Sequence, residues 1–185
     1  MNPTDGAQRE TIYLAGGCFW CLEAVYDRVE GVLDVESGYA NGHVERPTYE
    51  EVCRGDTGHA EVVKVVFDPA RIALRELLEI FFVIHDPTTL NRQGNDVGPQ
   101  YRSGIYWVDP RQADVAREVI ASLATSGAVA GRVVTEVEPL RQYWPAEDYH
   151  QDYFATHPHQ GYCAYVVAPK VEKFMKTFSS KLRKG

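Results

Sequence analysis

Two consecutive glycines, Gly16 and Gly17, are the feature that most constrains how this chain begins to fold. An apolar run, Thr11 to Ala15, ends directly before them, and apolar residues recur at helical spacing after them until Gly31. Glycine permits the tight turn that such a junction needs. The segment therefore predicts a strand, a glycine turn and a helix.

Further strand and helix patterns follow in regular succession. Strands are predicted over Val32–Tyr39, Ala60–Phe67 and Gly104–Val108. Helices are predicted over Leu74–Phe82 and from Pro110 to Leu123. The first six elements have the order βαββαβ, the split βαβ succession of ferredoxin-like domains. We therefore expect an α+β fold, a two-layer sandwich with helices on one face of a mixed, mostly antiparallel sheet.

Two parts of the chain have weaker patterns. The segment Phe82 to Tyr101 is long and irregular, which is often a property of functional loops. Val133–Val137 predicts an added strand, and a long irregular C-terminal segment rich in aromatic residues follows Pro139. That segment ends in an amphipathic helix around Val171–Phe178.

Length and composition favour a single soluble domain over residues 1–185, with residues 1–10 as a flexible N-terminus. The 185 residues are 44% hydrophobic and 24% charged, and a chain of this size hides roughly 70% of its unfolded surface. Nineteen Lys+Arg oppose 26 Asp+Glu without a basic stripe, which argues against a nucleic-acid partner. No apolar run has the length of a membrane span, and no secretory signal is visible. We expect a cytoplasmic monomer with no membrane partner.

The four cysteines are the residues most open to chemistry: Cys18, Cys21, Cys53 and Cys163. In a reducing cytoplasm such cysteines are reduced, metal-bound or catalytic rather than a disulfide framework. Cys18 lies at the first turn of the predicted helix, where free N–H groups and the helix dipole lower the pKa of a thiol. Cys18 is therefore the candidate nucleophile. The alternative is that Cys18 and Cys21 are small apolar residues, and Cys53 is interpreted as structural.

The pair Cys18 and Cys21 also fits two other classes of protein. A strand, Cys-x-x-Cys and a helix are typical of thioredoxin-like thiol-disulfide oxidoreductases, which would leave Glu61, Tyr49 and Cys163 without roles. A zinc-stabilised interaction module is the non-enzymatic alternative. Its candidate completing ligands lack a standard spacing: His150, His157, His159 and Cys163. We therefore predict no metal.

Glu61 is the candidate proton donor. By the two-residue period of a strand it shares a face with Val63 and Val65, the more apolar face. Partial burial raises the pKa of a carboxyl, so Glu61 can hold a proton near neutral pH. The alternative is an exposed glutamate at a strand end.

Several other side chains can assist at a site beside the cysteines. Tyr49 and Tyr101 border neighbouring loops, and a tyrosine hydroxyl is a good donor toward a developing oxyanion. Asp96 can orient a loop or a substrate amide, and Phe19 with Trp20 can form the wall of an apolar pocket. For each of them a turn or packing role is the alternative.

Five segments in register resemble the A-type peptide methionine sulfoxide reductases, covering about Ile12 to Cys163: GGCFWCLEAVYDRVEGV, SGYANG, TYEEVCRGDTGHAEVVKVVFDP, HDPTTLNRQGNDVGPQYRSGIY and AEDYHQDYF. The resemblance implies reduction of the S epimer of methionine sulfoxide, free or in proteins, to methionine. It also implies thioredoxin as the external reductant and no bound cofactor.

The resemblance further implies residue roles. Cys18 attacks the sulfoxide sulfur, and Glu61 protonates the departing oxygen. The remaining roles are hydrogen bonds to that oxygen from Tyr49 and Tyr101, a methyl pocket from Phe19 and Trp20, and support of the substrate by Asp96 and His150.

A resolving cysteine must then condense with the sulfenic acid on Cys18. The resemblance implies Cys163, which follows Gly-Tyr in a segment that is mobile in relatives. Cys21 is the alternative. At this position the chain departs from the commonest pattern of the family, because many relatives have a residue other than cysteine there. Helix positions three apart hold Cβ atoms about 5–6 Å apart, so a bond from Cys18 to Cys21 needs a modest shift, whereas a flexible loop at Cys163 relieves that constraint.

Overall fold

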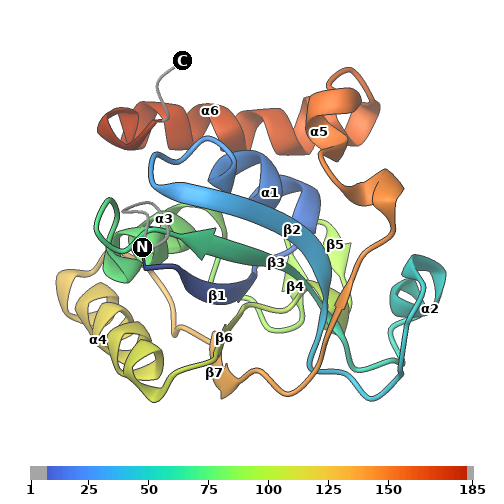
Figure 1. Ribbon diagram of the computed structural model, residues 1–185, viewed down its shortest axis with the longest axis horizontal. Helices are drawn as coiled ribbons and strands as arrows, with labels where there is room; N and C mark the ends of the chain where they lie inside the picture. The colour runs from blue at the N-terminus through green and yellow to red at the C-terminus, as the bar shows by residue number, and fades with distance from the viewer. Residues whose placement is uncertain (1–7, 183–185) are drawn as a thin grey trace, which may run out of the picture.

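The computed structural model describes residues 8–182 and is built on a six-stranded sheet with the order β7-β6-β1-β3-β2-β8 (Figure 1). Neighbouring strands are antiparallel, except β6 and β7, which are parallel. The predicted α+β fold with a mixed, mostly antiparallel sheet is confirmed. The strands are β1 (Glu10–Ala15), β2 (Val32–Ala40), β3 (Ala60–Phe67), β6 (Gly104–Trp107), β7 (Glu136–Pro139) and β8 (Tyr143–Pro145).

Helices cover one face of the sheet. Helix α1 (Phe19–Tyr26) contacts β2 and β3, and α3 (Leu74–Ile84) contacts α4 (Pro110–Ser126). Helix α6 (Ala168–Thr177) crosses over α1 and contacts both α1 and α3 (Figure 1). Two shorter helices complete the set, α2 (Tyr49–Cys53) and α5 (Tyr153–Thr156). Within residues 8–182, no helix combines the length and apolar composition needed to cross a bilayer.

Several predicted boundaries were wrong. The helix expected to reach Gly31 ends at Tyr26, because the backbone tightens into i to i−3 hydrogen bonds and Gly31 turns the chain with φ 96°. The predicted strand Val133–Val137 begins three residues later, where Glu136 pairs with β6. Of the predicted flexible N-terminus, residues 1–7 lie outside the described residues, and Glu10 already belongs to β1.

The sequence analysis missed helix α2, a small hairpin and strand β8, which lies in the segment expected to be irregular after Pro139. Helix α2 is capped by Thr48, whose side chain accepts from the N–H of Glu51 while the Glu51 carboxylate accepts from the N–H of Thr48, a capping box. Cys53 ends this helix as an exposed free thiol, and its interpretation as a structural residue stays a prediction. The segment expected to be irregular contains a small hairpin of β4 (Arg92–Gln93) and β5 (Asp96–Val97).

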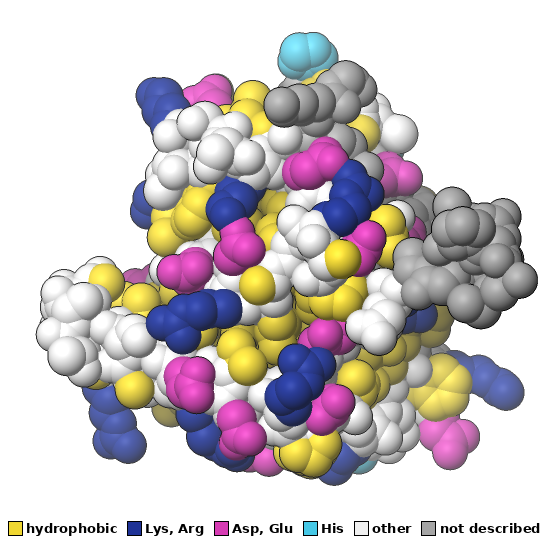
Figure 2. Space-filling model, turned by 60° about the vertical axis from the view of Figure 1, so that its left-hand side comes forward, with side chains coloured by type: hydrophobic (Ala, Val, Ile, Leu, Met, Phe, Trp, Pro, Cys, Tyr) yellow, Lys and Arg dark blue, Asp and Glu magenta, His cyan; other side chains and the backbone are white. Residues whose placement is uncertain are grey.

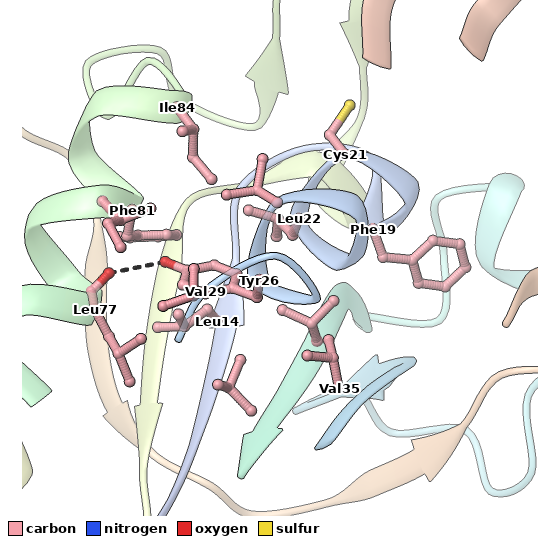
Figure 3. Close-up of a cluster of buried hydrophobic side chains, with 14 of the residues drawn as sticks. Leu14, Phe19, Cys21, Leu22, Tyr26, Val29, Val35, Leu77, Phe81 and Ile84 are labelled. Atoms are coloured by element: carbon pink, nitrogen blue, oxygen red, sulfur yellow. Dashed lines mark hydrogen bonds between the residues drawn. The ribbon is translucent and has the colours of Figure 1, made fainter. Parts of the chain in front are cut away.

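The residues of β1 divide between two apolar clusters. Ile12 and Leu14 face the helices, and the cluster there includes Leu22, Tyr26 and Phe81 (Figure 3). Tyr13 and Ala15 face the other side of the sheet, where the chain around Tyr143 packs on them. On the face shown in Figure 2, Lys and Arg side chains are interspersed with Asp and Glu and form no basic stripe.

Removing the hydroxyl of Tyr26 tests how α1 is held on α3. Tyr26 is fully buried, and its hydroxyl donates to the carbonyl oxygen of Leu77 over 2.9 Å (Figure 3). We expect Tyr26→Phe to lower the free energy of unfolding by about 1 kcal/mol, the usual net value of one hydrogen bond. Urea unfolding measures the loss. Tyr165→Phe, at a side chain that is 85% exposed, is the control and should leave the midpoint unchanged.

Candidate functional site

Cys18 lies at the junction of β1 and α1, as the glycine pattern predicted. It is the N-cap residue of α1, and Gly17 before it has φ 91°. A Cβ on Gly17 would lie 2.7 Å from Cγ of Gln93, so this position also needs glycine for lack of space. The Gln93 amide in turn bonds both the N–H and the carbonyl oxygen of Asp86. The turn that presents Cys18 is therefore packed against the loop that contains Asp86 and Gln93.

The predicted low pKa of Cys18 was wrong. Cys18 is only 8% exposed, and burial, the hydrogen bond with Cys21 and the nearby Glu61 carboxyl together raise its pKa well above the usual value. The pKa of Cys21 is instead lowered, first by the hydrogen bond with Cys18 and then by the charge of Lys170 and the hydroxyl of Tyr162. The helix terminus does not outweigh burial at Cys18, and Cys21 is the better-stabilised thiolate of the pair.

Glu61 points inward beside the start of α1, as predicted. Its side chain is 1% exposed, and its Oε1 accepts from the N–H of Phe19 over 3.1 Å. Burial raises its pKa to about 8, although the Phe19 hydrogen bond acts in the opposite direction. Its Oε2 is buried and finds no hydrogen-bond partner in the described part of the chain. A protonated Glu61 is therefore the expected form at neutral pH, with Oε2 as the atom that carries the proton.

Tyr49, Tyr101 and Asp96 gather around this carboxyl. Burial and then Glu61 raise the pKa of both tyrosines, and Asp96 contributes at Tyr101. Both tyrosines are therefore hydrogen-bond donors throughout the physiological range. The N–H of Tyr49 donates to Glu147 over 2.9 Å, so Glu147 holds the start of α2 against the site.

Phe19, Trp20 and His150 form the aromatic side of the site. Phe19 has no exposed surface, and its ring centroid lies 5.1 Å from that of His150. The indole N–H of Trp20 donates to Nδ1 of His150 over 3.1 Å. Tyr153 stacks on Trp20 with 3.9 Å between ring centroids. Nine of the ten residues singled out in the sequence therefore lie in or beside one region, and the tenth, Cys163, is near Cys21.

Cys163 occupies a different setting from the one predicted. It begins a π-helix, η3 (Cys163–Val167), and has no exposed surface, so the expectation of a flexible loop was wrong. Packing of this turn against α1 and α6 accounts for the difference. Burial raises the pKa of Cys163, and the nearby Cys21 raises it further. All four cysteines, each within the described range, are free thiols.

Comparison with known proteins identifies the family. The model of the peptide methionine sulfoxide reductase family matches residues 10–182. The chain belongs to this family. The peptide methionine sulfoxide reductase MsrA of Ralstonia nicotianae is 54% identical, over 97% of this chain and 96% of its own length. The chain is therefore an oxidoreductase, a peptide-methionine (S)-S-oxide reductase.

Solved structures agree with the assignment. Mxr1 from Saccharomyces cerevisiae in reduced form superimposes with a TM-score of 0.77 and 38% identity, over 85% of this chain and 90% of that chain. Mxr1 in complex with Trx2 gives a TM-score of 0.55 and 28% identity, over 80% of this chain and 87% of that chain.

Sequence reasoning missed three members of the reductase site: Glu147, Tyr153 and Tyr162. The first two stand in the motif AEDYHQDYF beside His150, and Tyr162 directly precedes Cys163. The motif around His150 and the position next to Cys163 were the available signals. In an irregular segment, however, the sequence pattern does not show which side chains face inward.

A carboxylate cluster stands apart from the thiols. Among the described residues, the one group spaced to hold a metal ion is Glu23, Asp27 and Asp152, and it contains no cysteine. Glu23 is buried, its pKa is raised to about 8 by burial, and its Oε1 accepts from the N–H of Asp152 over 2.8 Å. This arrangement joins α1 to the segment that begins α5.

Substitution of His150 tests how Trp20 is oriented. His150→Leu removes the acceptor of the indole N–H and leaves this donor without a partner, which typically costs about 1–3 kcal/mol. We expect a lower free energy of unfolding and altered fluorescence of Trp20. His159→Leu, at an exposed histidine near the same segment, is the control. An unchanged unfolding midpoint in His150→Leu would contradict the role given to this hydrogen bond.

Proposed function

We propose that Cys18 and Glu61 carry the reduction of the S epimer of methionine sulfoxide, in proteins or free, in a repair of oxidative damage. The observation that carries this proposal is the buried Glu61 carboxyl beside Cys18, with a pKa of about 8 and an unpartnered Oε2. A neutral carboxylic acid next to a thiol supplies the two groups that sulfoxide reduction requires, a nucleophile and a proton donor.

The chemical step conserves atoms and electrons as follows. The Cys18 sulfur bonds to the sulfoxide sulfur, the oxygen takes one proton from Glu61 and one from the Cys18 thiol, and the S–O bond breaks to release water. Water then attacks the Cys18 sulfur and returns a proton to Glu61, the S–S bond to the substrate breaks, and methionine leaves with the electron pair. Cys18 is left as a sulfenic acid. The substrate sulfur is reduced by two electrons, and the Cys18 sulfur is oxidised by two.

The surrounding side chains bind and orient the sulfoxide. Tyr49 and Tyr101 donate hydrogen bonds to the oxygen as negative charge develops on it. Phe19 and Trp20 enclose the methyl group, with His150 holding the indole. Asp96 accepts from an amide N–H of the residue that bears the sulfoxide.

Cys21 is our choice for the resolving cysteine, with Cys163 as the alternative. Cys21 already shares a hydrogen bond with Cys18, and its pKa is lowered. It attacks the Cys18 sulfur, the S–O bond breaks, and water leaves as the disulfide forms. Cys163 lies in a buried helical turn rather than a loop, which removes the argument that favoured it over Cys21.

Thioredoxin then reduces the disulfide by thiol exchange, and no bound cofactor is needed. The yeast Mxr1–Trx2 complex supports this partner.

We further infer one domain over residues 1–185 whose strands β6-β1-β3-β2 form a ferredoxin-like core, acting as a cytoplasmic monomer. The thioredoxin-like and zinc-module alternatives are not retained, because the family match spans residues 10–182.

The acid role of Glu61 has a pH signature. Its carboxyl is protonated below pH about 8 and loses its proton above it, so the single-turnover rate of methionine formation should fall as the pH rises through this value. Glu61→Gln should reduce the rate by ~10²–10⁴ and remove this descending limb. Stopped reactions with a methionine sulfoxide peptide measure both. An unchanged descending limb in Glu61→Gln would assign it to another group.

Serine variants identify the resolving cysteine in assays with thioredoxin present. Cys18→Ser should form no methionine. Cys21→Ser should form one equivalent and stop, because the sulfenic acid on Cys18 has no partner thiol, whereas Cys163→Ser should continue to recycle. Mass spectrometry of the disulfide-linked peptides completes the test, and a link between Cys18 and Cys163 in the wild type would make Cys163 the resolver.

A further inference from the structure

Tyr162 brings a hydroxyl from the C-terminal segment into the centre of the site. The hydroxyl donates to Oδ2 of Asp96, and it lies near enough to Cys21 to lower the pKa of that thiol. Its ring stands edge-on to Trp20, with 5.8 Å between ring centroids and an angle of 77° between planes. One phenol therefore touches both the side chain proposed to anchor the substrate and the thiol proposed to resolve the sulfenic acid.

A phenol has one proton and donates it to one strong acceptor at a time. In this structure Asp96 is the acceptor. A substrate amide that binds Asp96 competes for the same carboxylate. When the carboxylate is occupied, the Tyr162 hydroxyl has Cys21 as its other partner.

Lys170 adds a charge on the same side of Cys21. It lies on α6, half-buried, at the wall of a groove of about 850 Å³ that also contains His85. Its ammonium group forms no ion pair with any carboxylate between residues 8 and 182. Its charge lowers the pKa of Cys21. Figure 3 shows the Cys21 sulfur pointing away from the buried cluster around Leu22.

We infer that Tyr162 is a positioning residue with two alternative acceptors, Asp96 before the substrate binds and the Cys21 sulfur afterwards, where it acts with Lys170 to prepare Cys21 for attack. The inference rests on the proposed function, in which Cys21 resolves. In the step concerned, the Cys21 sulfur bonds to the Cys18 sulfur, the S–O bond of the sulfenic acid breaks, and the oxygen leaves as water with the proton from Cys21. Cys21 is oxidised as the sulfenic sulfur is reduced.

The variant Tyr162→Phe keeps the ring against Trp20 and removes only the hydroxyl. We expect two opposite effects in single turnovers with a methionine sulfoxide peptide. The half-saturating peptide concentration for methionine formation should fall, because Asp96 loses its competitor. The rate at which the Cys18 sulfenic acid disappears, measured by trapping with a 1,3-diketone and mass spectrometry, should fall roughly tenfold, as for loss of one hydrogen bond.

Tyr165→Phe is the matched control, since Tyr165 lies three residues along the same segment and is 85% exposed. It should leave both quantities unchanged. A purely structural role of Tyr162 would instead raise the half-saturating concentration and slow methionine formation. That result, or an unchanged sulfenic acid lifetime, would overturn the inference.

The charge of Lys170 is tested in the same assay. Lys170→Gln should lengthen the lifetime of the sulfenic acid, and Lys170→Arg should restore it, because the arginine keeps the charge. Lys173→Gln, at an exposed lysine on the same helix, should have no effect. Equal lifetimes in all three variants would exclude the electrostatic part of the inference.

Failure of this inference and failure of the proposed function give different results. If the disulfide forms at its normal rate in Cys21→Ser, Cys21 is not the resolver and this inference falls, whereas the proposed roles of Cys18 and Glu61 stand. If Cys21→Ser blocks the disulfide while Tyr162→Phe resolves as fast as the wild type, the resolver stands and only the role of Tyr162 is wrong.

Discussion

The buried hydrogen bond from the Phe19 N–H to Glu61 is the interaction on which the site depends. It joins the first turn of α1 to β3, and it holds the carboxyl beside Cys18 at the point where the helix begins. The helix end gains an acceptor for one of its free N–H groups, and the carboxyl gains a fixed orientation. One oxygen is thus used for structure and the other remains available for proton transfer.

Burial and charge compete in the cysteine pair, and their balance differs between neighbouring thiols. At Cys18 burial and the carboxyl of Glu61 outweigh the start of α1, so the thiolate is disfavoured. At Cys21 a hydrogen bond, a lysine and a phenol outweigh burial. Two thiols three positions apart at the start of α1 therefore have different environments, which suits the separate roles proposed for them.

The fold could be predicted from the sequence wherever local pattern and tertiary packing agree. The period-two pattern of Ala60–Phe67 placed β3 within the observed bounds and gave Glu61 its inward direction. The sequence pattern could not reveal that Cys163 is buried in a π-helical turn, because this turn depends on packing against α1 and α6. Nor could a local rule give the pKa of Cys18, since it depends on burial and on Glu61, which comes from β3.

The close fit of Gly17 against Gln93 has a consequence for the geometry of the whole site. Because the Gln93 amide also bonds the backbone of Asp86, the turn that carries the nucleophile and the hairpin that carries Asp96 are joined through a single side chain. The position of the turn before Cys18 relative to the hairpin consequently depends on the Gln93 side chain. A change of the Gln93 side chain would therefore alter two segments of the chain at once, although Gln93 supplies neither the thiols nor the carboxyl of the site.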